Sequence, residues 1–515
     1  MKRILLSIAV AFATLASLQA QDKVVQKILE IGKTDNRTMY YDDYLSSRIG
    51  GRVVGSHNLE DAEKWVAKQF KSMGLEVMVQ EVGEINVGFS RDYWTGRVIS
   101  NGLNEVLDFG TPSYTAGTHG VERGIVVMEP TTQREFDSIK GKLKGAWVLI
   151  GGKSNGMAID WSEAGNQKRA EQRAKNEEIQ RQNAEIARYN REHPEAPKAT
   201  LQPETISVPF YKEMVEAGIL GIIQAGDAPM QIHYDRINCY NITMDNLPNV
   251  CDIKLNAHQY EAIAQKVKDR ETVELEFDIR NHFFEGPVKY HNIIGILKGS
   301  KYPDEYVLMG GHLDAYDSAT GSVDDANGVA LTLEAARMLT TAGAKPKRSI
   351  MFCVWTGEEY GLLGSKFFVE NKTVPLNKIS NYFNRDGGPL ASTGITVPEA
   401  MYNDFVKITE PLKNFDPEMP FTLSKREGAP RPRPTTAGGS DHAYFAMNGV
   451  PTLSFSENDY KGYGFVYRDI WHTKTDILNA VYPDYMDYST VITAVTVYGV
   501  ANLDHLLSRD GLYSN

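Results

Sequence analysis

Residues 305–317 read EYVLMGGHLDAYD, residues 322–343 read SVDDANGVALTLEAARMLTTAG, and residues 348–365 read RSIMFCVWTGEEYGLLGS. The first and third stretches begin with apolar runs that predict buried strands, and the second has the apolar spacing of a helix. A strand–helix–strand order favours a parallel sheet with helices on both faces. We therefore predict an α/β fold with a doubly wound, mostly parallel sheet, and ligands in such folds bind beyond the carboxyl ends of the strands.

The flanking segments indicate how the rest of the chain is organised. Residues 60–82 combine helical periodicity with an alternating strand pattern, so residues 21–100 are expected to form the N-terminal part of the same α/β domain. Short β-rich runs predict a different domain over residues 101–280, and residues 281–515 return to α/β alternation. The charged residues 165–192 predict a solvated helical arm, within an insert over about 157–200. A dimerisation arm or a lid over the active site is the alternative.

Length and composition narrow the class of protein. The chain has 515 residues, of which 42% are hydrophobic, and this favours two or three globular domains. A formal net charge of -11 argues against nucleic acid or an anionic membrane as a partner. Residues 1–20 have a positive start, a short apolar run and a small residue at Ala20, which is typical of a cleaved signal peptide. We expect a secreted or periplasmic protein without a stable membrane span; an uncleaved anchor is the alternative.

The chain has three cysteines, Cys239, Cys251 and Cys353. Cys239 and Cys251 flank a short segment and could form a disulfide in an exported protein. Cys353 lies in an apolar run and is expected to be a small buried hydrophobe. Three cysteines cannot form a four-thiolate zinc site, so histidines and carboxylates must bind any metal.

Candidate metal ligands follow the first predicted strand. His312 ends that strand, and Asp314 lies on the same side of an extended chain, where its carboxylate could accept the other imidazole N–H of His312. Asp324 and Asp325 lie in a tight turn before a helix, where a cation would relieve the repulsion between them. A helix N-cap explains one of these two aspartates without a metal.

Three further segments supply candidate residues at predicted turns. Glu358 and Glu359 follow the second strand, where one could bind metal and the other could take a proton from water; an exposed acidic turn is the alternative. Asp386 follows another predicted strand, and His472 lies in the sequence WHTKTD. Each of the last two is a weak signal alone, because a single histidine is more often an ordinary packed residue than a ligand.

Taken together, these residues balance the charge of a two-metal site. Two zinc ions carry four positive charges, while Asp324, Asp386, Glu359 and one hydroxide carry four negative charges, and His312 and His472 add neutral nitrogens. Oxygen and imidazole donors of this kind suit zinc. The sequence therefore predicts two Zn²⁺ per subunit.

The motifs GHLD, DDANG, TGEEYGLLGS, NRDGG, GSDHAYFAMNGVP and IWHTKTD occur in an order that resembles the zinc-dependent exopeptidase family of bacterial leucyl aminopeptidases, glutamate carboxypeptidases and carboxypeptidase Q. The resemblance covers roughly residues 285–505 and extends to IGGRVVGSHNLEDAEKWVAKQF near the N-terminus, which is most similar to carboxypeptidase Q-like members. It implies a phosphorylase-like zinc exopeptidase fold. The runs YKEMVEAGILGIIQAGD and KGKLKGAWVLIGG also resemble the protease-associated domain inserted in this family.

The resemblance implies a role for each matched residue. Asp324 would bridge two zinc ions, His312 and Asp386 would complete one of them, and Glu359 and His472 would complete the other. It further implies that Glu358 is the general base, that Asp314 orients His312, and that a cis peptide bond follows Asp324. Asn327 departs from the Ser or Gly common in that turn, and the arm at 165–192 is not part of the family pattern.

These expectations together predict a secreted dinuclear zinc exopeptidase that hydrolyses short peptides, as an aminopeptidase or a carboxypeptidase Q-like dipeptidase. Arg431 or Arg433, in a loop rich in Pro, Gly and Arg, could contact a substrate carboxylate, although a solvent loop is the simpler interpretation. His442 is a further candidate for substrate binding and would share one side of an extended chain with Ser440. The partner is a peptide substrate rather than nucleic acid, and a homodimer is left open.

Two other functions remain as alternatives. A catalytically dead binding protein on the same fold would have lost ligands, but every expected position is filled. A glutaminyl-cyclase-like acyl transferase would use one zinc, so metal stoichiometry separates it from a two-zinc peptidase. The single G-x-S-x-G match, at residues 152–156, lies among turn residues of the β-rich segment 101–280, so a serine hydrolase is disfavoured, and the sequence has no H-E-x-x-H motif of a thermolysin-type enzyme.

Overall fold

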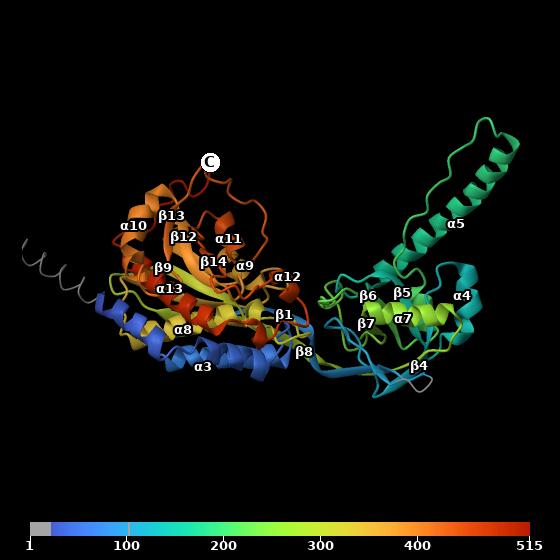
Figure 1. Cartoon of the computed structure of the whole chain (residues 1–515), viewed down its shortest axis with the longest axis horizontal. Coiled ribbons are helices and arrows are strands. Elements are labelled where there is room, and N and C mark those ends of the chain that lie inside the picture. The colour runs from blue at the N-terminus through green and yellow to red at the C-terminus, as the bar shows by residue number, and fades with distance from the viewer. Residues whose placement is uncertain (1–21, 101–103, 515) are drawn as a thin grey trace, which may run out of the picture. The chain divides into compact units, whose positions relative to one another are not determined.

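The computed structural model describes residues 22–100 and 104–514, so the signal peptide predicted at residues 1–20 lies outside the described residues. The chain divides into two compact units: Met1–Ile85 with Pro287–Asn515 form the first, and Asn86–Gly286 form the second (Figure 1). Strands β1 (Glu76–Val98) and β8 (Glu274–Leu297) each continue from one unit into the other. Among the described residues, no helix has both the length and the apolar character needed to span a membrane.

The first unit is built on strands in the order β11-β9-β10-β8. Strand β9 (Tyr302–His312) lies parallel to both β10 (Arg348–Trp355) and β11 (Ile379–Asn384), whereas β8 runs antiparallel to β10. The predicted α/β architecture is confirmed, but the sheet is mixed rather than mostly parallel. The antiparallel strand arises because β8 enters directly from the second unit and needs no crossover helix.

Helices cover both faces of this sheet. Helices α8 (Asn327–Thr341) and α13 (Pro483–Ala501) contact each other and both contact β9 and β10. On the other face, α9 (Leu363–Glu370) and α11 (His442–Met447) contribute Phe368 and Phe445 to a core that includes Leu308, Met351 and Trp355. Alternate strand residues thus pack on opposite helical layers, and this arrangement buries the strands on both sides.

The remaining elements of the first unit surround this core. A three-stranded sheet has the order β13-β12-β14. The strands of this sheet are β12 (Ala391–Val397), β13 (Thr422–Lys425) and β14 (Phe455–Asn458). Further helices of the unit are α2 (Thr38–Asp43), α3 (His57–Ser72), α10 (Glu399–Thr409) and α12 (Tyr467–Ile470).

The second unit has its own sheet, in which β4-β5-β6-β7 are parallel and the short strand β3 is antiparallel to β7. Two apolar clusters lie within this unit, one around Trp147 and Phe277 and the other around Val148 and Met214. The elements of the unit are β2 (Glu105–Val106), β3 (Phe109–Gly110), β4 (Glu122–Met128), α4 (Gln133–Ile139), β5 (Trp147–Lys153), α5 (Glu163–Glu192), α6 (Tyr211–Glu216), β6 (Gly221–Gly226), β7 (Cys251–Asn256) and α7 (Ala257–Lys268).

Helix α5 is the charged arm, and its prediction as a helix is confirmed. The chain returns along it without regular secondary structure, and three asparagines spaced seven residues apart hold that return segment (Figure 1). Each asparagine side chain donates to a backbone carbonyl and accepts from the amide of the same residue, at 2.7–2.9 Å. The three pairs are Asn176 with Glu204, Asn183 with Leu201, and Asn190 with Lys198.

The suggested disulfide is wrong. Cys239, Cys251 and Cys353 all carry free thiols and are buried. Cys251 lies in strand β7, and burial raises the pKa of the thiols of Cys239 and Cys251 above their usual value. These cysteines therefore pack as small hydrophobic residues, as expected for Cys353.

Candidate metal centre and substrate cavity

The carboxyl ends of three parallel strands carry the first side chains of the site. His312 is the last residue of β9 and lies in register with Trp355, the last residue of β10. Glu358 and Glu359 follow β10 in a turn, and Asp386 follows β11. Because parallel strands end at the same edge of a sheet, side chains from distant parts of the sequence meet there.

One carboxylate, that of Asp324, lies between two imidazoles. Its Oδ1 is 3.1 Å from Nε2 of His312, and its Oδ2 is 3.5 Å from Nε2 of His472. Nε2 of His312 is also 3.8 Å from Oδ2 of Asp386, and Nε2 of His472 is 3.0 Å from Oε2 of Glu359. The structure therefore brings together all five residues predicted as ligands, in two groups that share Asp324.

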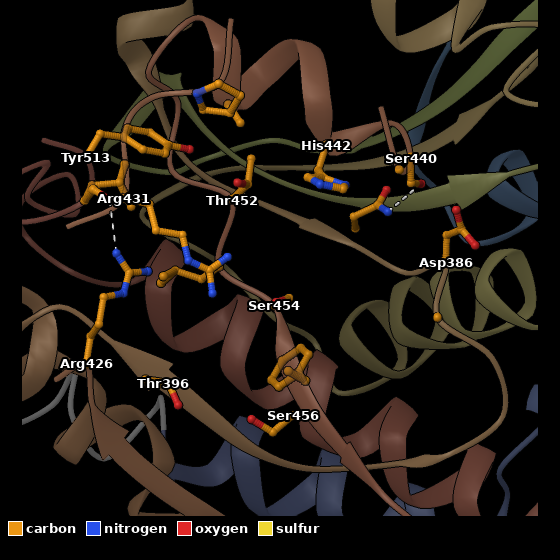
Figure 2. A pocket seen from close by; sticks show the side chains of 18 of the residues that line it. Asp386, Thr396, Arg426, Arg431, Ser440, His442, Thr452, Ser454, Ser456 and Tyr513 are labelled. Atoms are coloured by element: carbon orange, nitrogen blue, oxygen red, sulfur yellow. Dashed lines mark hydrogen bonds between the residues drawn. The ribbon is translucent and has the colours of Figure 1, made fainter. Parts of the chain in front are cut away.

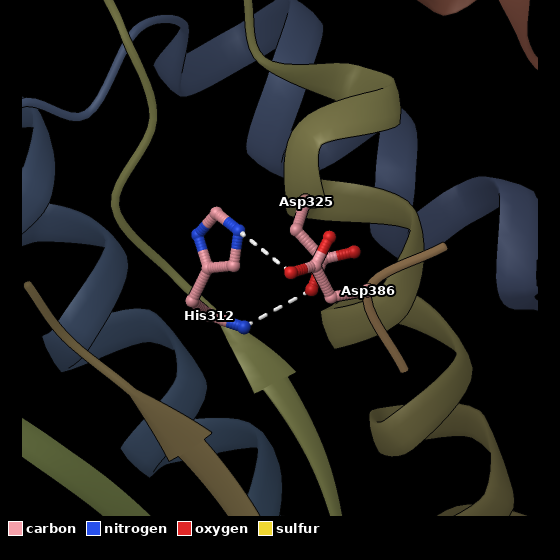
Figure 3. Close-up of side chains that lie close together, drawn as sticks. All are labelled: His312, Asp325 and Asp386. Carbon is pink, nitrogen blue, oxygen red and sulfur yellow. Dashed lines mark hydrogen bonds and ion pairs between the residues drawn. The ribbon is translucent and has the colours of Figure 1, made fainter. Parts of the chain in front are cut away.

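Asp325 also lies beside the site, since its carboxylate forms a group with His312 and Asp386 whose possible ligand atoms lie within 4.8 Å of one another. Its Oδ2 accepts a hydrogen bond of 3.0 Å from the backbone amide of His312, and its Oδ1 accepts one of 3.2 Å from Gly328. Figure 3 shows the carboxylates of Asp325 and Asp386 side by side near His312. The peptide bond between Asp324 and Asp325 is cis. Asp325 thus ties the end of β9 to the start of α8.

The role expected for the Asp314 carboxylate needs a correction. Nδ1 of His312 lies 2.9 Å from the backbone carbonyl oxygen of Asp314 and 3.9 Å from its carboxylate, so the carbonyl is the closer partner of the ring. The buried carboxylate instead accepts hydrogen bonds of 2.7–3.1 Å from the amides of Gly357, Glu358 and Glu359. Asp314 therefore fixes the turn that carries the two glutamates.

Two further residues of the site were not identified from the sequence. The carboxylate of Asp476 accepts from the amides of Val323 at 2.6 Å and Asp324 at 3.3 Å and so holds the turn before α8. Burial, together with the charges of Asp324 and Asp386, raises the pKa of the Tyr467 hydroxyl well above its usual range. Asp476 ends the quoted WHTKTD motif, and Tyr467 lies shortly before it. This motif was the signal that could have identified both residues.

The carboxylates of the site have little access to solvent. Burial raises the pKa of Glu358 and Glu359 well above the usual range, and neighbouring carboxylates raise it further. Burial also raises the pKa of Asp386, as does the charge of Asp324. Oε1 of Glu359 is buried and has no hydrogen-bond partner among the described residues. Carboxylates grouped in this way need a compensating cation, and carboxylate oxygens with imidazole nitrogens fit zinc.

A cavity of about 840 Å³ begins beside Asp386. Figure 2 shows Asp386, Ser440 and His442 on one side of this cavity and Arg426 and Arg431 on the other. His442 begins helix α11, so the chain around it is not extended as expected, yet both His442 and Ser440 line the cavity. Burial lowers the pKa of His442, which favours a neutral ring.

The two arginines considered from the sequence separate in the structure. Arg431 lines the cavity, whereas Arg433 does not, and the guanidinium of Arg433 lies beside Gly449. Both are exposed residues of the same loop. Their difference in position could not be derived from the sequence, because a loop rich in proline and glycine has no periodic pattern that fixes which way each side chain points.

Comparison with protein families matches residues 292–497 to the family described as Peptidase family M28. This segment contains the strands, helices and side chains of the candidate metal centre.

Several curated proteins are similar in sequence. The chain is 23% identical to carboxypeptidase Q of Mus musculus over 506 residues, which cover 96% of this chain and 92% of that protein. It is 28% identical to carboxypeptidase Q of Rattus norvegicus over 223 residues, or 42% of this chain and 43% of that protein. It is 35% identical to a glutamate carboxypeptidase 2 homolog of Caenorhabditis elegans over 192 residues, or 33% of this chain and 24% of that protein. The last two matches span less than half the length of those relatives.

Solved structures show a similar fold. A peptidase M28 precursor from Shewanella amazonensis SB2B has a TM-score of 0.57 and 20% identity, covering 95% of this chain and 98% of that chain. The zinc aminopeptidase BSAP from Bacillus subtilis has a TM-score of 0.51 and 17% identity, covering 93% of this chain and 97% of that chain. At these levels of identity the likeness concerns the fold.

Proposed function

We propose that this chain is a dinuclear zinc exopeptidase that hydrolyses short peptides, since residues 292–497 match Peptidase family M28 and the chain is similar to carboxypeptidase Q along 96% of its length. The observation that carries this proposal is the position of Asp324, whose two carboxylate oxygens face His312 and His472 separately. One carboxylate that faces two imidazoles can serve two metal sites. His312 and Asp386 would hold one zinc, and Glu359 and His472 would hold the other.

Bound zinc would supply Lewis-acid chemistry and a water of lowered pKa. The chain itself must then move protons and stabilise charge. Glu358 is partly exposed, follows β10, and has a carboxyl whose pKa burial raises well above its usual range. A carboxylate beside the metal centre can accept the proton of the attacking water and pass it to the leaving amine. Asp314 positions Glu358 through its backbone amide.

Tyr467 is the candidate for stabilising the developing oxyanion. A tyrosine hydroxyl is protonated at neutral pH and can donate a hydrogen bond, and Tyr467 is near enough to Asp324 and Asp386 for their charges to raise its pKa. A donor aimed at the carbonyl oxygen strengthens its bond as negative charge develops in the transition state. In this proposal Glu358 accepts and donates the proton, and the Tyr467 hydroxyl stabilises the negative charge on the carbonyl oxygen.

The function is tested by substituting Glu358→Gln and measuring metal content and dipeptide cleavage. Gln has nearly the same shape but cannot accept the proton, so we expect two zinc ions per chain in both proteins and a fall in kcat of roughly 10²–10⁴-fold. Glu370→Gln is the matched control, since Glu370 is exposed at the end of α9, and it should leave both quantities unchanged. Chelation should abolish cleavage by the unsubstituted protein, and added zinc should restore it.

Other outcomes would favour the alternative functions. One zinc per chain, with cyclisation of N-terminal glutamine, would favour a glutaminyl-cyclase-like transferase. Two zinc ions with no cleavage of any short peptide would favour a binding protein on this fold. Full activity in a folded, metal-loaded Glu358→Gln protein would reject Glu358 as the base.

The proposal extends to the second unit and to location. The segment 101–280 lies inside the second unit, and we propose that this unit is a protease-associated domain. We also propose export through the segment 1–20, with activity outside the cytoplasm, either as a single chain or as a homodimer. N-terminal sequencing of the exported protein would test cleavage of the predicted signal.

A further inference from the structure

The cavity beside the candidate metal centre has more positive side chains than the proposed chemistry uses. Arg385, Arg426 and Arg431 line it, together with the carboxylates of Asp386, Glu427 and Glu457. Asp386 belongs to the candidate metal centre. What this cavity binds therefore depends on which of the arginines are already paired within the protein.

Two of the three arginines have acceptors in the protein. Nη2 of Arg385 lies 3.5 Å from Oε1 of Glu457, and this pair is largely buried. Nη1 of Arg426 donates to the backbone carbonyl oxygens of Leu512 at 3.0 Å and Gly511 at 3.4 Å. Arg385 thus balances a carboxylate of the cavity wall, and Arg426 holds the chain segment that forms another part of the wall.

Arg431 differs from both. Its backbone carbonyl accepts from Ser514, but its guanidinium has no hydrogen-bond or ion-pair partner among the described residues. Glu427, the nearest acidic residue of the same loop in sequence, forms no ion pair with it among those residues. In the part of the chain that the structure describes, the neighbouring guanidinium of Arg426 donates to neutral carbonyls and forms no ion pair. With two guanidiniums and the one carboxylate of Glu427, this side of the cavity has a net positive charge, opposite the side that holds Asp386 (Figure 2).

We propose that this cavity binds a carboxylate of the peptide substrate and that Arg431 is the residue that pairs with it. The carboxylate belongs to the part of the peptide that extends from the scissile bond away from the metal centre. The proposal rests on the proposed peptidase function and identifies its substrates as short peptides with a carboxylate near the cleaved bond. A guanidinium forms two parallel hydrogen bonds with a carboxylate, which gives both orientation and affinity. A cavity of about 840 Å³ is within the range of small-ligand sites, so it suits one or two residues rather than a long chain.

The carboxylate could be the C-terminal group of the peptide or an acidic side chain. The two sources share the same chemistry at Arg431, and peptides that carry one group without the other distinguish them. Alanyl-alanine has only the C-terminal carboxylate, its C-terminal amide has none, and alanyl-aspartate amide has only the side-chain group.

The test measures binding, so that it does not depend on turnover. In the full-length, zinc-loaded Glu358→Gln protein, calorimetry should show alanyl-alanine binding at least tenfold more tightly than its amide. Adding Arg431→Gln should remove this difference by weakening the acid and not the amide, and Arg431→Lys should recover part of it. Adding Arg433→Gln instead is the matched control, because this exposed arginine of the same loop does not line the cavity. It should preserve the full difference.

Each result has a defined consequence. Tighter binding of alanyl-aspartate amide than of alanyl-alanine amide, lost in Arg431→Gln, would assign the side-chain carboxylate as a ligand. Equal affinity for acid and amide, or an unchanged preference in Arg431→Gln, would overturn the proposal. If the unsubstituted protein, which keeps Glu358, binds the carboxylate but cleaves no peptide, this inference stands and the proposed function is rejected. The two can therefore fail separately.

Discussion

At the scale of single residues, the candidate site depends on side chains that touch no substrate. Arg52 is fully buried and donates to five backbone carbonyls, at distances of 2.6–3.2 Å. These acceptors belong to residues 45–50 of the N-terminal segment and to residues 313–321 between His312 and Asp324. One guanidinium therefore fixes the loop that connects two candidate ligands, which explains why IGGRVVGS accompanies the metal-site motifs.

Arg52→Met should destabilise the protein strongly. Methionine fills much of the volume but leaves buried carbonyls without donors, and each such group costs about 1–3 kcal/mol. We expect a loss of about 3–5 kcal/mol in the free energy of unfolding, measured by denaturant titration of the full chain. Arg48→Met is the control, because Arg48 is exposed and contacts Asp43 and the Tyr44 ring at the surface. A loss below about 1 kcal/mol for Arg52→Met would show that other contacts hold the loop.

The sequence was most informative where residue type and strand end coincide. His312, Asp324, Glu359, Asp386 and His472 could be selected because each combines a ligating side chain with a predicted turn or strand end. The partner of an imidazole could not be predicted in the same way. An Asp two residues after a histidine suggests its carboxylate as the partner of the ring, but the backbone carbonyl of Asp314 is the closer partner of His312. Hydrogen bonds from buried carboxylates to backbone amides, as for Asp476, depend on loop geometry that no spacing rule encodes.

At the scale of elements, the arm shows how a highly charged segment can hold a defined shape. Three asparagines recur every seven residues along α5, and their backbone partners recur every three residues along the return segment. Seven helical residues rise about 10.5 Å, and three extended residues span about 10 Å. The two repeats therefore match in length, so each asparagine meets the next backbone unit of the segment.

Asn183→Ala should loosen the middle of this arm. The substitution removes both hydrogen bonds to Leu201, of which the amide bond is 2.7 Å long. We expect amide exchange at Leu201 to accelerate by roughly tenfold, because one exposed hydrogen bond contributes about 1 kcal/mol. Hydrogen-exchange mass spectrometry would measure it, and Gln180→Ala, at an exposed position of the same helix, should leave exchange unchanged. Unaltered exchange at Leu201 in Asn183→Ala would mean that the asparagine ladder does not order the segment.

Element types were easier to predict than strand directions. The helix over residues 60–74 and the strands that end at His312 and Trp355 followed from periodicity. The antiparallel placement of β8 did not, because its direction is set by where the chain returns from the second unit rather than by its own residues. The helical arm was predictable from composition, but the N-x₆-N-x₆-N repeat acquires its meaning only beside the return segment.

At the scale of the whole molecule, the carboxylates of the candidate site gather in the interior of the first unit. All of the predicted ligands and the other buried carboxylates of the site belong to the first unit, whereas the second unit has separate apolar cores around Trp147 and Met214. Burial of several like charges opposes folding unless cations accompany them. We infer that metal binding contributes to the stability of the first unit and not to that of the second.

Removing metal should therefore destabilise one unit selectively. Binding to the folded state alone contributes about 2.7 kcal/mol when free metal is at 100 times its Kd. In the full chain, chelation should accelerate amide exchange by about a hundredfold in β9 and β10, measured by hydrogen-exchange mass spectrometry, while β5 and β6 of the second unit serve as the internal control. Zinc should reverse the change, and magnesium should not, because imidazole ligands favour zinc. Equal acceleration of exchange in both units would indicate global destabilisation by the chelator. No change in β9 and β10 would mean that metal binding does not stabilise the carboxylate cluster.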